Sequence, residues 1–171
     1  GGSVGMSGVG PASAWQIVND GVMGGVSDSR VRALPDGGVR FEGVVRLDHN
    51  GGFASMRRPW TLPAGARGVQ VQARGDGNRY RLTVYTRDAA SGRAWPFSYH
   101  AVFETAAGAT AVAPLPWPQF RAGFRGRAVP DAPPLAAADV IAVGIMITRD
   151  EHRERAGAFV LDLVEIAALA T

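Results

Sequence analysis

The sequence predicts an all-β protein folded as a single jelly-roll β-sandwich. Apolar and polar residues alternate in many short segments, and this period of two is typical of strands with one buried face. The chain has 23 glycines and 11 prolines among its 171 residues, which favours many tight turns between short strands. No segment shows the apolar spacing of an amphipathic helix three turns long. Together these observations indicate antiparallel strands packed in two layers.

The first clear strand runs through residues 39–47, where apolar and polar side chains alternate. Residues 52–57 follow as its expected partner across the turn 48–51. This turn contains Asn50-Gly51, a strong hairpin signal because both residue types tolerate positive φ. We therefore expect these two segments to form a β-hairpin.

A second hairpin is predicted from residues 69–74 and 79–85, which flank the turn 75–78. Pairing Arg74 with Arg79 places the apolar side chains on one face, and a one-residue slip would mix the two faces. The face away from the core would then carry the polar set Gln70, Gln72, Arg74, Arg81, Thr83 and Tyr85.

The remaining expected strands span residues 97–105, 110–115, 140–148 and 158–168. Proline-rich linkers at 114–118 and 130–134 separate them, and residues 135–139 favour a short helical turn. A chain of 171 residues fits one domain. We therefore assign residues 1–13 to a flexible N-terminal segment and residues 14–171 to a single jelly-roll domain.

The composition argues against nucleic acid as a partner. All 18 basic residues are arginines, the net charge is only +3, and no basic stripe appears. The lack of cysteine excludes disulfides, thiol nucleophiles and cysteine-ligated zinc. No apolar run is long enough to span a membrane, and the first residues lack the features of a signal peptide. We expect a cytoplasmic protein of a bacterium.

No catalytic constellation stands out. Residues 25–29 lack the closing glycine of a nucleophile elbow, and no lysine follows the glycines of residues 23–25 as a phosphate-binding loop requires. The three histidines, His49, His100 and His152, lie far apart in the sequence and have no metal-ligand spacing. We therefore predict no catalytic residue, no metal site of this kind and no organic cofactor.

Two alternatives to a plain binding domain remain open for the acidic residues. Asp20, Asp162 and Glu165 could hold a structural calcium ion that ties the ends of a sandwich together, or they could be ordinary surface carboxylates. An enzyme acting on a sugar or nucleotide-like ligand would use Asp20, Asp76 or His100 as its acid or base. A deep pocket that gathers these groups would favour the enzyme, whereas a shallow face would favour binding.

The polar face of the second hairpin is the clearest functional signal in the residues themselves. Planar amides, guanidinium groups and an aromatic ring suit a polyhydroxylated ligand, since they offer paired hydrogen bonds and a stacking surface. The alternative is the solvated outer face of an antiparallel sheet. The aromatic residues in the segments 95–97 and 117–120 are more typical of packing beneath loops.

Several motifs in order along the chain resemble a known family. They are Trp15 with the segment 19–27, Phe41-Glu42-Gly43, the segment 50–55 with Arg57, Arg74-Gly75-Asp76-Gly77 with Tyr80, Tyr99 with Phe103, Arg125-Gly126-Arg127, and Gly144-Ile145-Met146-Ile147. Over residues 14–168 the sequence resembles the complex I intermediate-associated protein 30 family.

The resemblance implies a galactose-binding-domain-like jelly roll, an architecture shared with many carbohydrate-binding modules. Mitochondrial members assist assembly of respiratory complex I, the NADH:ubiquinone oxidoreductase, through protein interaction. We therefore expect a non-catalytic binding or assembly module whose partner is a protein or a carbohydrate-like ligand. A purely structural interaction domain is the further alternative, and an exposed apolar patch near Trp117 and Phe120 would be its sign.

The expected ligand surface joins the glycine-rich segment 19–27 to the polar face of the second hairpin. Glycines in that segment allow positive φ or close backbone approach, and its first two side chains can organise the turn. The candidate ligand-binding residues are Asn19, Asp20, Arg57, Gln72, Arg74, Asp76, Arg81 and Tyr85.

Overall fold

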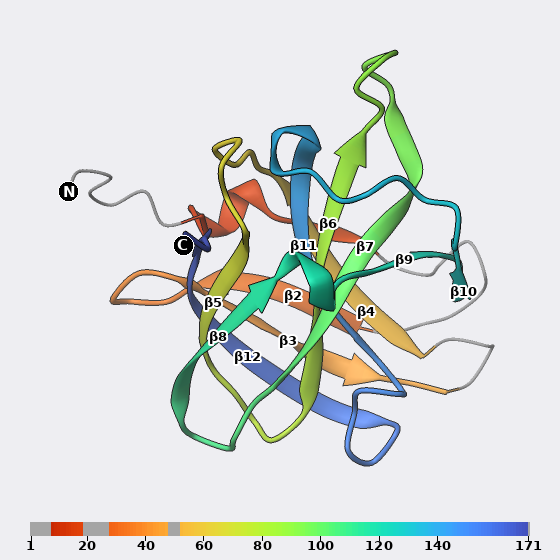
Figure 1. Cartoon of the computed structure of the whole chain (residues 1–171). Coiled ribbons are helices and arrows are strands. Elements are labelled where there is room, and N and C mark those ends of the chain that lie inside the picture. The colour runs from red at the N-terminus through yellow and green to blue at the C-terminus, as the bar shows by residue number, and fades with distance from the viewer. Residues whose placement is uncertain (1–7, 19–27, 48–51, 171) are drawn as a thin grey trace.

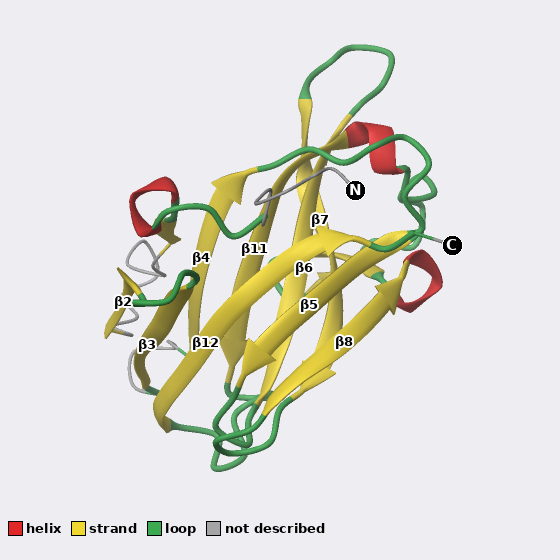
Figure 2. Ribbon diagram, turned by 90° about the vertical axis from the view of Figure 1, so that its left-hand side faces the viewer, coloured by secondary structure: helices red, strands yellow, loops and turns green. Residues whose placement is uncertain are grey.

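The computed structural model describes residues 8–18, 28–47 and 52–170. Over these residues the chain forms two antiparallel sheets that pack face to face, with their strands buried on the inner side (Figures 1 and 2). The prediction of an all-β sandwich is confirmed. Period-two alternation explains the two layers, because each sheet must bury one apolar face against the other.

One sheet has seven strands and the other has five. The larger sheet runs in the order β1 (Gln16–Val18), β4 (Phe53–Pro59), β11 (Val140–Thr148), β6 (Arg79–Arg87), β7 (Ala94–Glu104), β9 (Arg121–Phe124) and β10 (Arg127–Ala128). The smaller sheet runs β2 (Asp28–Ala33), β3 (Val39–Val45), β12 (Gly157–Ala168), β5 (Gly68–Arg74) and β8 (Thr110–Pro116). Short 3₁₀ turns lie at η1 (Ala12–Ala14), η4 (Trp117–Gln119) and η5 (Ala137–Asp139). The turn η5 confirms the helical turn predicted in residues 135–139.

Both predicted hairpins are wrong, for the same physical reason. Strand β3 pairs with β2 and β12 in the smaller sheet, whereas β4 pairs with β1 and β11 in the larger one. Likewise β5 pairs with β12 and β8, whereas β6 pairs with β11 and β7. Each connection therefore crosses from one sheet to the other. Alternation specifies which side chains face the core, but it does not specify the sheet that a strand joins.

The apolar faces of β5 and β6 do point inward, although from opposite layers. Their inward side chains are buried: Val69, Val71, Ala73, Tyr80, Leu82 and Val84. The Tyr80 ring lies between the layers, with its centroid 6.1 Å from that of Phe103 and 6.4 Å from that of Phe159. The core is thus closed by residues from both sheets, and the outer faces are left for polar groups.

Residues 8–13, which we assigned to a flexible segment, lie against the sandwich. The Gly8 amide donates to the Ile166 carbonyl at 2.8 Å, and Val9 is buried. The Trp15 indole donates to the Val9 carbonyl at 2.8 Å.

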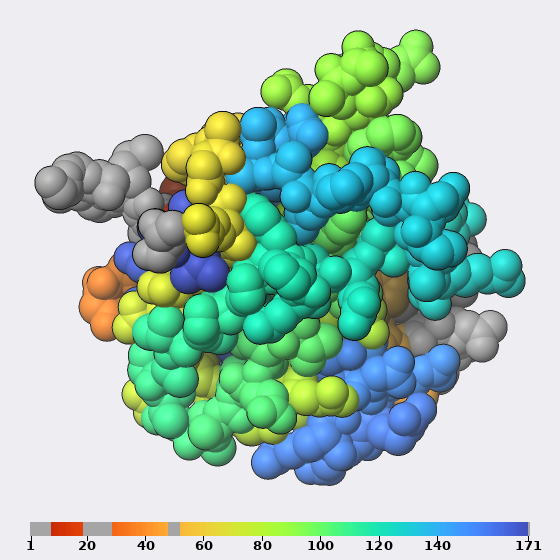
Figure 3. All heavy atoms as spheres, viewed as in Figure 1, coloured from red at the N-terminus to blue at the C-terminus, as the bar shows by residue number. Residues whose placement is uncertain are grey.

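The aromatic residues of both predicted segments pack against neighbours, but Trp95 and Phe97 lie in strand β7 rather than in a loop. The centroids of Trp117 and Phe120 lie 5.3 Å apart in an edge-to-face arrangement, and the Trp117 indole donates to the Ala66 carbonyl. Trp95 stacks on Phe97 at 5.2 Å. The β6–β7 hairpin, whose tip precedes Trp95 in the chain, projects from the body of the sandwich, at the top of Figures 1 and 3. No helix in the described residues is long and apolar enough to cross a membrane.

Candidate functional site

The outer face of the seven-stranded sheet carries a row of side chains that crosses six of its strands. Strand pairing places these residues directly opposite one another, and we call them the outer row: Gln16, Arg57, Gly144, Thr83, His100 and Arg121. Four strand spacings separate Arg57 on β4 from Arg121 on β9, a span of about 19 Å. Arg81 and Tyr85 flank the row on β6, two residues to either side of Thr83.

Near one end of the outer row, an arginine covers an aromatic ring. The Arg57 guanidinium carbon lies 4.9 Å from the centroid of the Tyr85 ring, within the range of a cation–π contact. Gly144 allows the close approach of β4, since a Cβ there would lie 2.7 Å from the Met56 carbonyl oxygen, whereas it would be in ordinary contact with Tyr85 Cε2 at 3.4 Å. Burial raises the pKa of the Tyr85 phenol, and the Arg57 charge partly opposes the rise. A cation therefore lies against this ring.

A buried carboxylate holds Arg81 on the same face. Glu151, which follows β11, is 4% exposed, and its Oε1 accepts hydrogen bonds from the Thr148 amide and hydroxyl. Arg81 Nε lies 2.9 Å from the same oxygen, as an ion pair outside hydrogen-bond geometry. The carboxylate therefore fixes both the turn after β11 and the position of this arginine.

His100 lies in the middle of the outer row and is half-buried. Burial lowers the pKa of its imidazole, and the positive charge of Arg81 lowers it further, while Glu151 acts in the opposite direction. The ring is therefore neutral at pH 7, with one donor and one acceptor nitrogen. Within the described residues, neither His100 nor Arg121 makes a side-chain hydrogen bond or ion pair. Both are free to contact a ligand.

The outer face of the five-stranded sheet has a different electrostatic arrangement. Arg40 donates to both oxygens of Asp162 at 2.6 and 2.9 Å, and this pair raises the pKa of Arg40. Arg30 and Arg32 both donate to one oxygen of Glu42, at 3.1 and 2.9 Å. Burial alone would raise the pKa of Glu42, but the two arginines more than offset this and hold it below its usual value. These charges satisfy one another.

The predicted polar face is divided between these two surfaces. Gln72 and Arg74 lie on β5, in the five-stranded sheet, opposite Glu165 and Asp162 of β12. Arg57, Arg81 and Tyr85 lie on the seven-stranded sheet. The prediction that Gln72, Arg74 and Arg81 share one face is therefore wrong, because it rested on the hairpin that the sheets replace. Asn19 and Asp20 lie outside the described residues.

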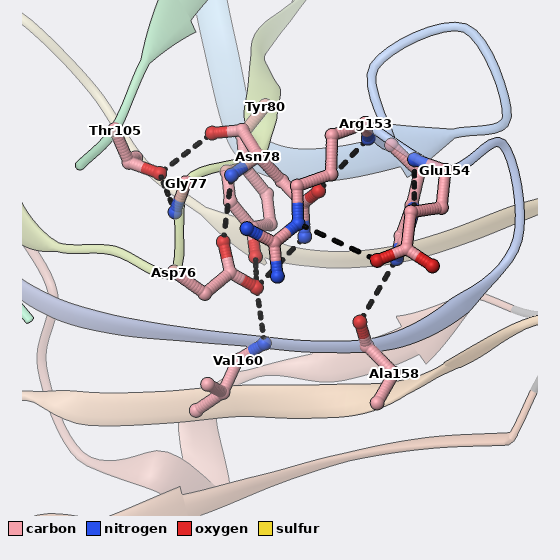
Figure 4. Close-up of polar contacts among 10 residues, drawn as sticks. Asp76, Gly77, Asn78, Tyr80, Thr105, Arg153, Glu154, Ala158 and Val160 are labelled. Carbon is pink, nitrogen blue, oxygen red and sulfur yellow. Dashed lines mark hydrogen bonds and ion pairs between the residues drawn. The ribbon is translucent and has the colours of Figure 1, made fainter. Parts of the chain in front are cut away.

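Asp76 forms the centre of a hydrogen-bond network at one end of the sandwich (Figure 4). Its carboxylate accepts from the Asn78 amide and side chain, from the Tyr80 hydroxyl at 2.9 Å and from the Val160 amide at 2.8 Å. Burial raises the pKa of Tyr80, and the charge of Asp76 raises it further. Because its oxygens are already engaged, Asp76 joins the turn after β5 to β12 and offers no free base.

Asp76 and His100, the two described residues named for the enzyme alternative, are not gathered in one pocket. Asp76 lines a hollow of about 580 Å³ together with Glu42, Val44 and Arg153, at the five-stranded sheet. His100 lies on the outer face of the other sheet, opposite Thr83 and Arg121. The two residues thus cannot act on the same bound atom.

The calcium alternative gains no support from the described residues. Asp162, one of its named ligands, is engaged by Arg40. The described part of the chain contains no group of three or more His, Asp or Glu side chains that could hold a metal ion.

Sequence reasoning missed Arg121 and assigned His100 only to the enzyme alternative. His100 does stand at an outward position of an alternating strand, between Tyr99 and Ala101, both of which are buried. Its position next to Thr83 and Arg121 depends on β7 lying between β6 and β9, which no local pattern specifies.

The fold belongs to the class of jelly-roll β-sandwiches seen in carbohydrate-binding modules. The structure is similar to the family 11 carbohydrate-binding module of the cellulosomal cellulase Lic26A-Cel5E of Clostridium thermocellum, with a TM-score of 0.64, 13% identity, and coverage of 97% of this chain and 94% of that one. A second structure of the family 11 module from Clostridium thermocellum, in complex with a β-1,3-1,4-mixed-linked tetrasaccharide, matches with a TM-score of 0.63, 13% identity, and coverage of 92% and 91%.

The sequence profile of complex I intermediate-associated protein 30 matches residues 7–163. The chain therefore belongs to the complex I intermediate-associated protein 30 family, as its motifs predicted. No curated protein matches its sequence significantly.

Proposed function

We propose that this protein is a non-catalytic binding module that takes a polyhydroxylated, carbohydrate-like ligand on the outer face of its seven-stranded sheet. The observation that carries the proposal is the outer row. Its hydrogen-bonding side chains extend over about 19 Å, and two of them, His100 and Arg121, have no partner among the described residues. Polar side chains that are held by a rigid sheet and lack partners, as the exposed Arg121 and the half-buried His100 do, suit the recognition of hydroxyl groups.

The fold supports this proposal by analogy. The similar family 11 module was solved with a bound tetrasaccharide, so a sandwich of this architecture can present a glycan-binding surface.

A glycan panel tests the proposal. We expect purified protein to bind at least one soluble polysaccharide in affinity electrophoresis, and His100→Ala combined with Arg121→Ala to weaken this binding by about tenfold or more. Gln72→Ala combined with Arg74→Ala is the matched control, because it removes an amide and a guanidinium from the other outer face. Equal loss in both double variants, with unchanged thermal unfolding, would contradict the proposed site.

A role in assembling a protein complex is the second candidate, and family membership together with the β6–β7 hairpin favours it. The tip of the hairpin is internally bonded: the Asp88 carboxylate accepts from the Ala90 amide and the Ser91 hydroxyl, and Gly92 donates to the Asp88 carbonyl. A rigid projection of this kind suits insertion into a partner.

The assembly candidate is tested by deleting the gene in the source organism and measuring assembled NADH:ubiquinone oxidoreductase. We expect less complex in the deletion strain, recovery with the wild-type chain, and weaker recovery when Arg87 and Arg93 at the tip are both replaced by Glu. A normal level of complex in the deletion strain would rule this candidate out.

A further inference from the structure

The middle of the seven-stranded outer face has an excess of positive charge. Arg57, Arg81 and Arg121 lie in or beside the outer row, on three different strands. The one carboxylate that contacts this group among the described residues is Glu151, which pairs with Arg81. Arg79 and Glu104 stand opposite each other nearer the end of the sheet and offset one another. Two guanidinium groups, those of Arg57 and Arg121, are therefore left without a neutralising carboxylate within the described residues.

The two arginines lie four strands apart in the row, on β4 and β9, with neutral hydrogen-bonding groups between them. Thr83 and His100 lie between Arg57 and Arg121 in register. An arginine offers a planar pair of N–H donors that matches carboxylate or sulfate oxygens, whereas a neutral imidazole matches sugar hydroxyls. Thr83 is 3% exposed, so His100 is the group between the arginines that a ligand can reach. The row thus places one site for hydroxyl groups, at His100, between two sites for anionic groups.

The aromatic group on this face points to the same ligand class. A neutral glycan or a nucleobase would gain most from an open ring face on which to stack. Here one face of the Tyr85 ring is in contact with the Arg57 guanidinium, so a ligand that reaches this ring also meets a positive charge. This arrangement favours an anionic sugar over a neutral sugar or a base.

We propose that the ligand of this face is an acidic polysaccharide, a polyhydroxylated chain whose carboxylate or sulfate groups pair with Arg57 and Arg121. The inference rests on the proposed glycan-binding function and specifies its substrate class. A carboxylated chain and a sulfated chain share the chemistry that the arginines recognise, and the experiment separates them.

The experiment measures binding of the full chain to four probes by titration calorimetry at low and high salt. The probes are polygalacturonate, heparin, mixed-linked β-glucan and a DNA duplex. We expect binding to polygalacturonate or heparin that weakens with added salt, because guanidinium–anion pairs are screened by ions. We expect binding of the β-glucan to be at least about tenfold weaker, since two charge-assisted contacts are missing.

The variant Arg57→Gln/Arg121→Gln removes the two charges and keeps planar hydrogen-bonding groups. We expect it to lose affinity for the acidic chain by about tenfold or more, with little change toward β-glucan. Arg74→Gln/Arg87→Gln removes the same net charge away from the row and is the matched control. It should bind the acidic chain within about twofold of wild type.

The possible outcomes separate the inference from the proposed function. Binding to β-glucan alone, lost in the His100/Arg121 double variant, would overturn the acidic ligand class but leave the glycan-binding face standing. Binding to no polysaccharide would overturn both. Equal binding to DNA and heparin, or equal loss in the control variant, would show a nonspecific response to charge and would also overturn the inference.

Discussion

The two outer faces of this sandwich are built from similar residues but are electrostatically different. On the five-stranded sheet, Arg40 is paired with Asp162, and Arg30 and Arg32 share Glu42. On the seven-stranded sheet, only Arg81 of the three central arginines has a carboxylate partner among the described residues. An arginine-rich strand face therefore suggests a ligand only when the neighbouring strands leave its charges unpaired.

The largest expected effect comes from the buried carboxylate of the seven-stranded face. Glu151→Ala should lower the free energy of unfolding by about 3 kcal/mol, because two donors on Thr148 and the charge of Arg81 lose their buried partner. Urea denaturation measures this loss. The exposed Glu104 provides the control Glu104→Ala, which should cost less than about 0.5 kcal/mol. A similar small loss for both would mean that Glu151 has no structural role.

The next effect concerns the five-stranded face. Asp162→Ala should lower the free energy of unfolding by about 1 to 2 kcal/mol, because Arg40 loses both of its short contacts to the Asp162 carboxylate. Water screens this ion pair only partly. Glycan affinity should stay within about twofold of wild type, because this face is not the ligand surface. Chemical denaturation and affinity electrophoresis on the same sample check both statements. A large loss of affinity would remove the distinction between the faces.

Acid should affect each face over its own pH range. His100 has a pKa below its usual value, so it contributes stability above about pH 6.5 that is lost as the pH falls through the lowered pKa. Glu42 also has a lowered pKa, so its contribution is present above about pH 4.5 and is lost at lower pH. Each effect should be below about 1 kcal/mol. Thermal melts of His100→Ala and Glu42→Gln across pH 3–8 should each lose one of the two pH-dependent steps; an unchanged profile would contradict the assignment.

The smallest effect on stability should accompany a large effect on binding. Arg121→Ala should change the free energy of unfolding by less than about 0.5 kcal/mol, because its side chain is exposed and has no partner among the described residues. The affinity of this variant for the acidic polysaccharide should fall by about tenfold. Thermal unfolding paired with calorimetric titration measures both quantities. Loss of stability together with affinity would instead indicate that the residue supports the fold.

The sequence was sufficient to predict the layers of the fold, because alternation marks the buried side of each strand. Val71 and Leu82 were correctly predicted to face the core. Their sheets were not predicted, because the short turn 75–78 looks like a hairpin turn while the chain in fact crosses between layers. For the same reason, the predicted ligand surface combined residues from opposite faces. Arg74 lies on the outer face of the five-stranded sheet, and Arg81 lies on the outer face of the seven-stranded sheet.

Part of the site was nevertheless predictable. Arg57, Arg81 and Tyr85 were named from the sequence, and the structure brings them together on one sheet. Arg121 was not predictable from local pattern, because its place beside His100 depends on a pairing between β7 and a strand that follows a proline-rich linker. Long-range pairing of this kind is a property of the whole topology and leaves no trace in a single segment.

Nuclear magnetic resonance titration of the ¹⁵N-labelled full chain with an acidic oligosaccharide tests whether the outer face of the seven-stranded sheet is the ligand surface. We predict that the backbone amides of β4, β6, β7 and β9 and the arginine Nε–H groups of Arg57 and Arg121 shift together, while those of Arg40 and Arg74 stay in place. Shifts concentrated on β3, β12 and β5, with the outer row unmoved, would contradict it.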